Sequence, residues 1–438
     1  MSFRIVLASF ALTSTFFAQT WADDVAPIIY DNCTICHRPD ESGPFPLLSY
    51  RDVSKRAKMI KRITADRDMP PWHPVEGHGE FVGAMRLSAE EIATLGRWAD
   101  AGAPEGDATR APEPPSFASG WALGPPDLIV EMSEVFEVPA DGPDIYRNFV
   151  IPLGLERDVH LAAIDVRPSA RTVLHHTIFE LDQTGYARRR AGRCGKPGFS
   201  GMEGGGAGRD AGRGDDLDFG SSGVGGWAVG GQARRLPLGL GRHVPAGSDL
   251  VLRSHFHPSG KPEKEKTTLG LYFTPEPPSR KLLGVQLPTA FGVYAGLDIP
   301  AGQADFEIKD DFVLPVDCLA LSVGGHAHQV CREMQLEVEA PDGQKRSLFL
   351  IDDWKFNWQN RYQYREPVPL AAGTRVSARI LYDNSADNPQ NPYVPPRRIR
   401  WGLQSNDEMG SVTLLLVAQN ESESEALAKA LRQKIRSV

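Results

Sequence analysis

The spacing of apolar and polar positions changes along the chain and divides it into parts. At residues 50–63 apolar side chains recur three and four positions apart, which is typical of an amphipathic helix. Ser88 and Glu91 match a capping box ahead of a second such run, which stops at Gly102. We therefore expect residues 23–107 to form a small all-α domain.

Beyond a proline-rich stretch at residues 108–126, which we interpret as an extended linker, the pattern becomes one of short β-branched and apolar runs separated by turn residues. Such runs without intervening helices are typical of β-sandwiches, and the stretch is too long for one sandwich of about 100 residues. We expect two all-β sandwiches, at residues 127–278 and 279–420, and a helical tail at 421–438. The strand-like runs are 148–153, 160–166, 172–181, 249–257, 267–273, 318–323, 334–339, 347–351, 375–382 and 411–417.

A glycine-rich region interrupts the first sandwich. Residues 192–231 contain 16 glycines. Glycine weakens strands because it has no side chain to pack and much backbone freedom to lose, so we predict a loop there rather than a strand.

The first 22 residues have the pattern of a secretory signal peptide. Arg4 provides a positive charge, residues 5–17 are apolar, and Thr20 and Ala22 place small side chains for cleavage after about Ala22. No later stretch approaches the roughly 18 apolar residues of a membrane-spanning helix. We expect a periplasmic or secreted protein without a membrane span.

Composition narrows the classes of partner. With 41% hydrophobic and 24% charged residues the chain is globular, and its net charge of −8 does not favour nucleic acid, which requires a basic surface. The five cysteines are odd in number and too few for a disulfide scaffold.

The first chemical motif is a C-x-x-C-H sequence at Cys33, Cys36 and His37. It is the attachment motif of covalent haem c, in which two thiols bind the porphyrin and the histidine binds iron. The alternatives are a redox C-x-x-C pair, which would not need His37, and a zinc half-site, which lacks its second half. We expect a haem.

The second iron ligand would come from a residue downstream. We favour Met69, because two prolines follow it and because a Met/His pair gives the raised potential of electron-transfer haems. Met85, His73 and His78 remain alternatives. With its MPPW sequence followed by a final capped helix, the segment resembles a small bacterial cytochrome c domain.

Most of the other histidines lie in pairs within strand-like runs or at their ends. Residues two apart share a face of a strand and can chelate one metal ion, whereas adjacent residues point to opposite faces and need a bulge or twist to do so. The pairs are His175 with His176, His255 with His257, and His326 with His328.

The surrounding sequences resemble the type II copper, ascorbate-dependent monooxygenases, a family that includes peptidylglycine and dopamine β-monooxygenases. The matching segments occur in the family's order and span roughly residues 127–417. They are VLHH at 173–176, LVLRSHF at 250–256, GHAH at 325–328 and SNDEM at 405–409.

The resemblance implies two jelly-roll sandwiches that each bind one copper ion. Three imidazoles suit a copper that cycles between oxidation states, and a thioether favours Cu(I), the state that meets O2. His257 is an alternative to His255, and His243 is a weaker one. By matched position, the electron-transfer copper would be held by His175, His176 and His255, and the O2-binding, catalytic copper by His326, His328 and Met409.

The family reaction inserts one oxygen atom from O2 into an aliphatic C–H bond and consumes two electrons. The resemblance therefore implies a small-molecule substrate and a redox donor, either an ascorbate-like reductant or an electron-transfer protein, with the fused haem as a further electron route. The alternative is a non-catalytic periplasmic haem and copper protein that carries electrons or binds copper.

Two departures from the family change these expectations. Gly324 stands where peptidylglycine enzymes have the arginine that binds the peptide carboxylate, and Ser411 and Thr413 replace an Asn and a Tyr, so a glycine-extended peptide is not the expected substrate. Of the three remaining cysteines, Cys318 and Cys331 flank the GHAH segment, which suggests a pairing across a hairpin that leaves Cys194 free.

Overall fold

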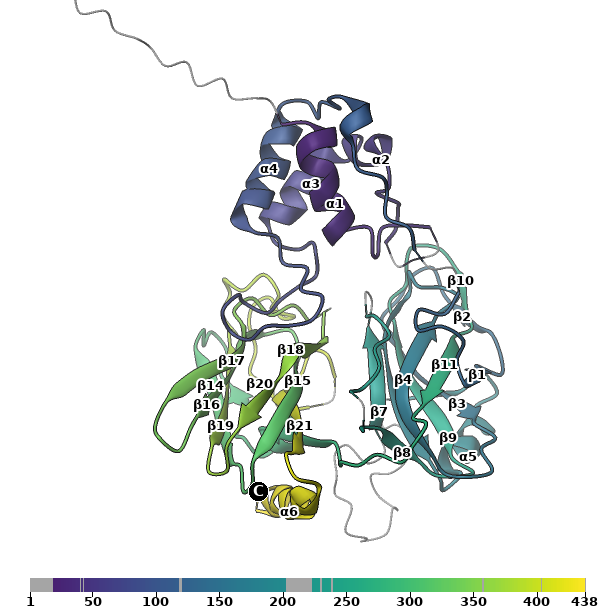
Figure 1. The fold of residues 1–438 in the computed structure, drawn as a ribbon, viewed down its shortest axis with the longest axis vertical. Helices are drawn as coiled ribbons and strands as arrows, with labels where there is room; N and C mark the ends of the chain where they lie inside the picture. Colours follow the sequence, from purple (N-terminus) through teal and green to yellow (C-terminus); the bar gives the residue numbers. More distant parts are fainter. Residues whose placement is uncertain are drawn as a thin grey trace, which may run out of the picture. The chain divides into compact units, whose positions relative to one another are not determined.

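The computed structural model describes residues 19–39, 41, 43–117, 120–201, 223–228, 231–237, 239–356, 358–402 and 404–437. It divides the chain into two compact units (Figure 1). A helical unit comprises Met1–Pro71 with Met85–Ser116, and a β unit comprises Trp72–Ala84 with Phe117–Val438. The segment Trp72–Ala84, which we expected in the haem domain, therefore belongs to the β unit.

The helical unit is built from short helices. The expected capping box is present at α4: the Ser88 side chain accepts the Glu91 N–H, and the Glu91 side chain accepts the Ser88 N–H. The single helix expected at residues 50–63 is two helices, α2 and α3. The elements are a π-helical turn η1 (Trp21–Val25), α1 (Ala26–Asn32), α2 (Tyr50–Ser54), α3 (Ala57–Ala65), α4 (Ala89–Asp100) and a 3-10 turn η2 (Ala108–Arg110).

The core of the helical unit begins before the expected cleavage site. Trp21 is 3% exposed and Ala22 is 2% exposed. The Trp21 ring packs edge-on against Tyr30 with 5.6 Å between centroids, and its backbone N–H bonds the Pro104 carbonyl. Cleavage after Ala22 would remove a tryptophan from this core, so the structure favours a mature chain that retains Trp21. Residues 1–18 of the expected signal peptide lie outside the described residues.

The first sandwich of the β unit packs two sheets over one apolar core. One sheet has the order β1-β11-β4-β8 and the other β6-β3-β9-β5-β7, with β10-β2 as a separate pair. The strands are β1 (Leu128–Glu131), β2 (Phe136–Val138), β3 (Ile145–Pro152), β4 (Val159–Arg167), β5 (Leu174–Asp182), β6 (Phe199–Ser200), β7 (Gly223–Ala228), β8 (Arg242–Val244), β9 (Asp249–Phe256), β10 (Glu263–Glu265) and β11 (Thr268–Phe273).

The second sandwich repeats this plan with its own core. Its sheets have the orders β12-β21-β15-β18 and β14-β19-β16-β17, and β13-β20 is a separate pair. A 3-10 turn, η3 (Thr289–Gly292), follows β12. The strands are β12 (Leu283–Leu287), β13 (Asp298–Ile299), β14 (Phe306–Val313), β15 (Cys318–Ala327), β16 (Cys331–Glu339), β17 (Lys345–Ile351), β18 (Arg361–Leu370), β19 (Arg375–Tyr382), β20 (Ile399–Arg400) and β21 (Gly410–Ala418).

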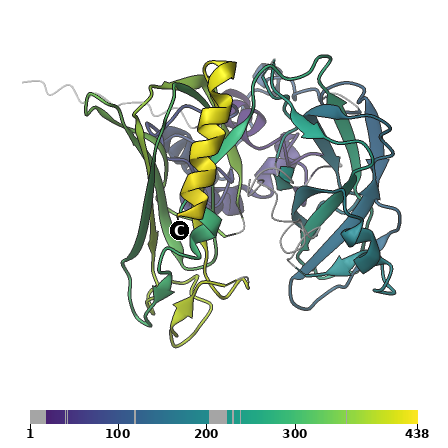
Figure 2. The ribbon, with the colours of Figure 1, turned by 90° about the horizontal axis from the view of Figure 1, so that it is seen from below.

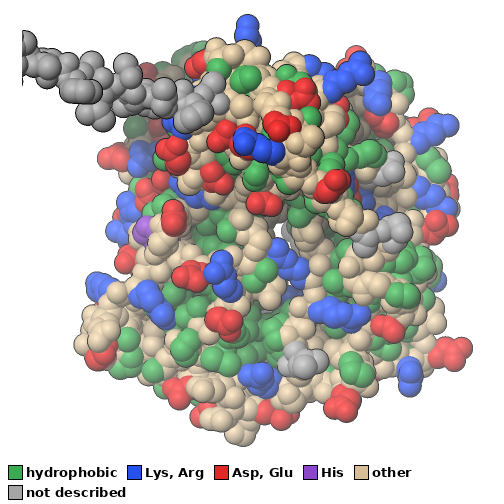
Figure 3. Space-filling model, turned by 45° about the horizontal axis from the view of Figure 1, so that its top comes forward, with side chains coloured by type: hydrophobic (Ala, Val, Ile, Leu, Met, Phe, Trp, Pro, Cys, Tyr) green, Lys and Arg blue, Asp and Glu red, His purple; other side chains and the backbone are tan. Residues whose placement is uncertain are grey.

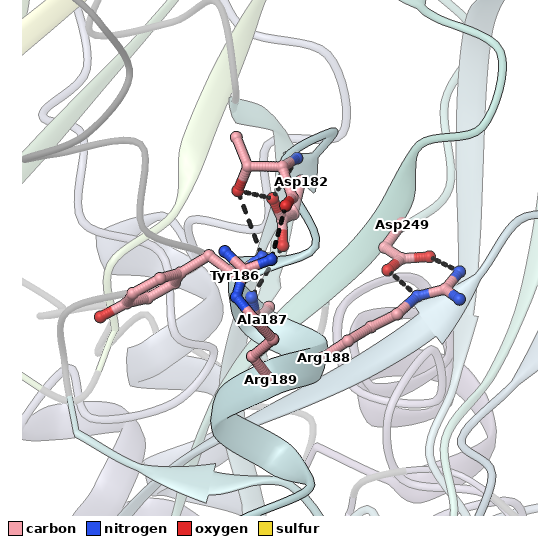
Figure 4. A network of polar contacts seen from close by, with 7 residues as sticks. Asp182, Tyr186, Ala187, Arg188, Arg189 and Asp249 are labelled. Atoms are coloured by element: carbon pink, nitrogen blue, oxygen red, sulfur yellow. Dashed lines mark hydrogen bonds and ion pairs between the residues drawn. The ribbon is translucent and has the colours of Figure 1, made fainter.

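Two helices flank the sandwiches. The carboxylate of Asp182 accepts the Ala187 N–H at the start of α5 (Tyr186–Ala191), and Arg188 of α5 forms an ion pair with Asp249 (Figure 4). The expected C-terminal helix is α6 (Ser424–Arg436), which runs along the second sandwich and packs Leu427 into its core (Figure 2).

The glycine-rich region is not loop throughout, contrary to our expectation. Within residues 192–231 the chain forms β6 and β7, and β7 pairs with β5, where Ala228 lies opposite His176. Val224 and Trp227 supply the apolar contacts that the glycines lack. Residues 202–222 lie outside the described residues.

The expected pairing of Cys318 with Cys331 is wrong, because both thiols are free and buried. Cys318 begins β15 and Cys331 begins β16, in the facing sheet. The ten-residue strand β15 separates Cys318 from the turn into β16 by about 30 Å at 3.3 Å per residue, far beyond the reach of a disulfide. Cys194 is also free, and it is exposed.

The surface carries charges of both signs. On the face drawn in Figure 3, Lys and Arg side chains are interspersed with Asp and Glu. Among the described residues, none of the helices has both the length and the apolar character needed to cross a bilayer.

Candidate metal centres

Three of the predicted ligands converge in the first sandwich. One candidate ligand atom from each of His175, His176 and His255 lies within 4.8 Å of the others. The ring centroids are 4.9 to 5.3 Å apart. Two nitrogens bound at about 2 Å to one tetrahedral ion are about 3.3 Å apart, so a closure of at most about 1.5 Å between any two of these atoms would complete a three-nitrogen site.

A bulge brings the two adjacent histidines together. Leu174 lies opposite Phe256 and His176 opposite His255, so His175 is an extra residue in β5. An extra residue lets both imidazoles turn to one side of the sheet, and their Nδ1 atoms are 3.1 Å apart. The bulge that we expected to be necessary for both histidines to bind one metal ion is therefore present.

His255 is held from behind by a carboxylate and a ring. Its Nε2 lies 2.7 Å from Asp144 Oδ2, and Tyr146 stacks on its imidazole with centroids 4.4 Å apart and planes 8° apart. Hydrogen bonds from His255 and then His257, against the effect of burial, lower the pKa of Asp144 to about 2. The ionised carboxylate can only accept, so His255 Nε2 donates and its Nδ1 keeps a lone pair.

His257 is not the third member of the cluster. It is exposed, and its Nδ1 lies 2.8 Å from the other oxygen of Asp144. His243 lies elsewhere, with its Nε2 2.9 Å from Asp158 and its ring beside His160. Of the alternatives considered from the sequence, the geometry selects His255.

One imidazole of the cluster, that of His176, favours the neutral form. Desolvation by the surrounding protein holds the pKa of His176 well below its ordinary value, and the neighbouring His255 and His175 lower it further. A neutral imidazole is the form that binds a metal ion.

The second sandwich brings together the other predicted set. His326 and His328 share a face at the end of β15, with ring centroids 5.5 Å apart. His326 lies opposite Ser411 and Ala327 opposite Gly410, so the next step of this register places Met409 opposite His328. Met409 is 5% exposed. The backbones of His328 and Met409 are thus close together where β15 and β21 approach each other, because one Glu408 oxygen accepts both N–H groups.

These imidazoles also favour the neutral form. Desolvation, followed by the charge of His328, lowers the pKa of His326 to about 3. Burial lowers the pKa of His328 as well. His328 Nδ1 lies 3.2 Å from the Asp407 carbonyl, which can only accept, so Nε2 keeps the lone pair.

One buried carboxylate organises the backbone of this set. Glu408 is 0% exposed, and its two oxygens accept the N–H groups of His328, Val330 and Met409. Burial raises the pKa of Glu408 to about 8 against the effect of these hydrogen bonds. Trp354 Nε1 donates to the His328 carbonyl at 3.0 Å.

Aromatic rings flank both imidazoles of the second set. Phe291 packs edge-on against His326 with centroids 5.0 Å apart, and Phe356 against His328 at 5.8 Å. Phe291 has φ of 54°, an uncommon backbone for a residue with a side chain. Each imidazole of this set therefore has one apolar ring beside it.

The C-x-x-C-H motif lies at the end of α1 in the helical unit. Neither Cys33 nor Cys36 forms a disulfide, and burial raises the pKa of Cys33 to about 12. His37 Nδ1 lies 3.0 Å from the Phe45 carbonyl, so it donates there and Nε2 is left to bind a metal. These residues fit covalent haem, because they provide two thiols outside any disulfide and an oriented imidazole.

The candidates for the second haem ligand divide between the units. Met69 and Met85 belong to the helical unit, and Met69 follows α3 half-buried. His73 and His78 belong to the β unit, where His73 is buried and His78 Nδ1 bonds Ser347 Oγ at 2.8 Å. Met69 remains our prediction.

Sequence reasoning missed the residues that support the ligands. Asp144 is 111 positions from His255, so no local spacing could have connected them. Glu408 lies within a segment that matches the copper family, but nothing in the sequence indicated which backbone groups it binds.

Comparisons with known proteins add little. No protein-family model matches the chain, and no curated protein matches it. Solved structures with some likeness include Broad Bean Stain Virus (6% identity, 70% of this chain and 92% of that chain, TM-score 0.29). Another is PNGF-II (10% identity, 67% of this chain and 66% of that chain, TM-score 0.27). A third is the major capsid protein P2 of bacteriophage PM2 (10% identity, 66% of this chain and 97% of that chain, TM-score 0.25). These likenesses are too weak to carry any conclusion.

Proposed function

We propose that the chain is an exported copper-dependent monooxygenase. It would hydroxylate an aliphatic C–H bond of a small organic substrate with O2, with electrons supplied through its own c-type haem. The observation that carries the proposal is the convergence of His175, His176 and His255 around one point, 80 residues apart in the chain.

The two ligand sets differ in the way such a reaction requires. Copper ions held by them would supply one-electron transfer at the first set and O2 activation at the second. The first set offers three imidazoles, which accommodate both oxidation states. The second offers two imidazoles and the soft sulfur of Met409, which favours the reduced state.

The protein's part is to hold these groups and to shape what approaches them. Glu408 fixes the backbone of His328 and Met409 together. The rings of Phe291 and Phe356 exclude water beside the imidazoles and favour a substrate with apolar surface. Gly324 leaves the carboxylate-binding position of peptidylglycine enzymes empty of a side chain, which supports a substrate other than a peptide.

The helical unit would deliver electrons one at a time. Cys33 and Cys36 would hold the haem covalently, and His37 would bind its iron through Nε2, with Met69 as second ligand. The haem would supply one-electron redox chemistry, which suits a reaction that consumes two electrons in separate steps.

The test begins with metal content. Haem-loaded protein from a periplasmic expression host should bind two copper ions per chain, counted by elemental analysis and seen by EPR. With ascorbate as reductant and a panel of small aryl-alkyl compounds, it should consume O2 and yield hydroxylated product. Less than one copper per chain would refute the proposal.

Met409→Ile separates the proposal from its main alternative. The variant should lose substrate-dependent O2 uptake and keep its haem spectrum, while Met132→Ile, at a buried methionine of the first sandwich, should keep both. A protein that binds two coppers and exchanges electrons with its haem, but never consumes O2, would instead be a haem and copper electron carrier.

A further inference from the structure

Asp144 connects two histidines of which only one belongs to the copper cluster. It lies just before β3, whose residues Ile145 and Tyr146 pair with Phe256 and His255 of β9. Its Oδ2 lies 2.7 Å from His255 Nε2, and its Oδ1 lies 2.8 Å from His257 Nδ1. One carboxylate therefore contacts both histidines, with one oxygen on each.

The inner nitrogen of His255 has no such partner. Its Nδ1 is buried and, among the described residues, accepts and donates no hydrogen bond. The ring cannot swing to find one, since His255 is 2% exposed and Tyr146 stacks on its face. A buried ring nitrogen without a hydrogen bond costs folding free energy. Because this nitrogen belongs to the cluster with His175 and His176, we interpret it as a ligand atom for a metal ion.

We propose that Asp144 is the positioning residue of the three-histidine site: it fixes His255 with the proton on Nε2 and Nδ1 aimed at copper, and His257 anchors the carboxylate rather than binding metal. This inference rests on the copper site of the proposed function and does not depend on oxygenase activity.

The expected effect follows from the chemistry of the outer shell of metal sites. A carboxylate that accepts from a ligand imidazole orients the ring and makes it a stronger donor, and its loss typically lowers metal affinity by about 10- to 100-fold. The negative charge also stabilises Cu(II) over Cu(I), so its removal should raise the reduction potential. His257 is exposed and bonds only the far oxygen, so its removal should weaken copper binding by less than about 3-fold.

The experiment measures Cu(II) affinity by chelator competition, together with the EPR spectrum, in haem-loaded protein. A His326→Ala/His328→Ala background confines copper to the first site. Asp144→Ala should lose 10- to 100-fold in affinity with altered copper hyperfine coupling, and His257→Ala should retain the parent spectrum. Asp158→Ala is the matched control, because Asp158 bonds the exposed His243 at 2.9 Å in the same way but lies outside the cluster, and it should change neither quantity.

Asp144→Asn keeps the shape of the side chain and guards against misfolding of the alanine variant. It should raise the reduction potential of the copper, because one amide cannot replace the charge. The inference is wrong if both Asp144 variants bind copper as tightly as the parent with unchanged EPR, or if His257→Ala loses as much copper as His255→Ala. If the parent protein itself binds no copper, the proposed function fails as well. If only the predictions for the Asp144 variants fail, the inference about Asp144 is wrong and the proposed function still stands.

Discussion

The buried carboxylate of Glu408 accepts a hydrogen bond from the backbone N–H of His328, 80 residues earlier in the chain. The same oxygen accepts the N–H of Met409, and the second oxygen accepts that of Val330. A strand end and a loop that carry candidate ligands are thus tied together by one side chain. The geometry of the second candidate metal site therefore depends on Glu408 as well as on the candidate ligands.

Glu408→Gln should weaken this site without touching a ligand. Both oxygens of the Glu408 side chain accept N–H groups, whereas an amide has one accepting oxygen, so at least one buried N–H would face a donor, at a cost of about 1–3 kcal/mol. We expect a lower free energy of unfolding in denaturant titration and weaker Cu(I) binding at the second site. Glu421→Gln, at an exposed glutamate, should change neither. Equal stability of the two variants would contradict the role of Glu408.

Gly43→Ala should reduce haem attachment. A Cβ atom at Gly43 would lie 2.6 Å from the Cys36 carbonyl oxygen and 2.8 Å from His37 Nδ1, so the attachment motif would have to move. Covalent haem per chain, measured by pyridine haemochrome absorbance, should fall severalfold. Gly96→Ala is the control: its Cβ meets nothing within 4 Å, and in α4 it should stabilise the helix by about 1 kcal/mol. Full haem loading of the Gly43 variant would refute this account.

The mature protein should retain Trp21. N-terminal sequencing of exported protein should find this residue, because its ring fills the core of the helical unit. Trp21→Ala should destabilise that unit by about 3–5 kcal/mol, as other buried aromatic truncations do. The measurement is thermal unfolding followed by haem absorbance. A mature chain that begins at Asp23 and unfolds at the same temperature would overturn the prediction.

Acid should destabilise the metal-free β unit in part through His73. Burial lowers the pKa of His73 to about 4, whereas an unfolded histidine titrates near 6.5. The unfolded state therefore binds more protons between these values, and stability falls as the pH drops through this window. From pH 7 to pH 5 the loss from this residue should be about 2 kcal/mol.

The measurement is urea unfolding of copper-free protein at both pH values. His73→Phe should lose less stability than the parent between pH 7 and pH 5, by about that amount. His243→Gln, at an exposed histidine, should keep the parent's pH dependence. If stability falls with pH as steeply in His73→Phe as in the parent, the folded parent must accommodate the charged imidazole of His73, and the prediction is wrong.

Many strands were predictable from their apolar runs, but others were missed, among them β12 and β14, whose residues alternate in burial. Each of the ten predicted runs coincides with a strand, from β3 to β21. β18 was missed because Pro367 and Pro369 disfavour strand pairing, yet it lies at the edge of its sheet, where a proline needs no partner on one side. β7 was missed because its glycines show no alternation of apolar and polar residues. It forms a strand because it pairs with the edge of β5.

The candidate metal ligands were largely visible in the sequence, since histidine pairs in strands and a C-x-x-C-H motif are rare and chemically specific. The sequence could not choose between His255 and His257, which have the same spacing and the same face. The carboxylate of Asp144 decides this: it leaves the inner nitrogen of the buried His255 free and binds His257 at the surface.

By itself the sequence determined which residues can bind metals, and where helices give way to strands, because these depend on side-chain chemistry and local periodicity. Only the tertiary structure decided which ligands meet, that Cys318 and Cys331 lie in facing sheets, and that Trp72–Ala84 joins the β unit. The physical reason is that these outcomes depend on strand register, on a one-residue bulge at His175 and on buried carboxylates far away in the chain, and none of these leaves a local pattern.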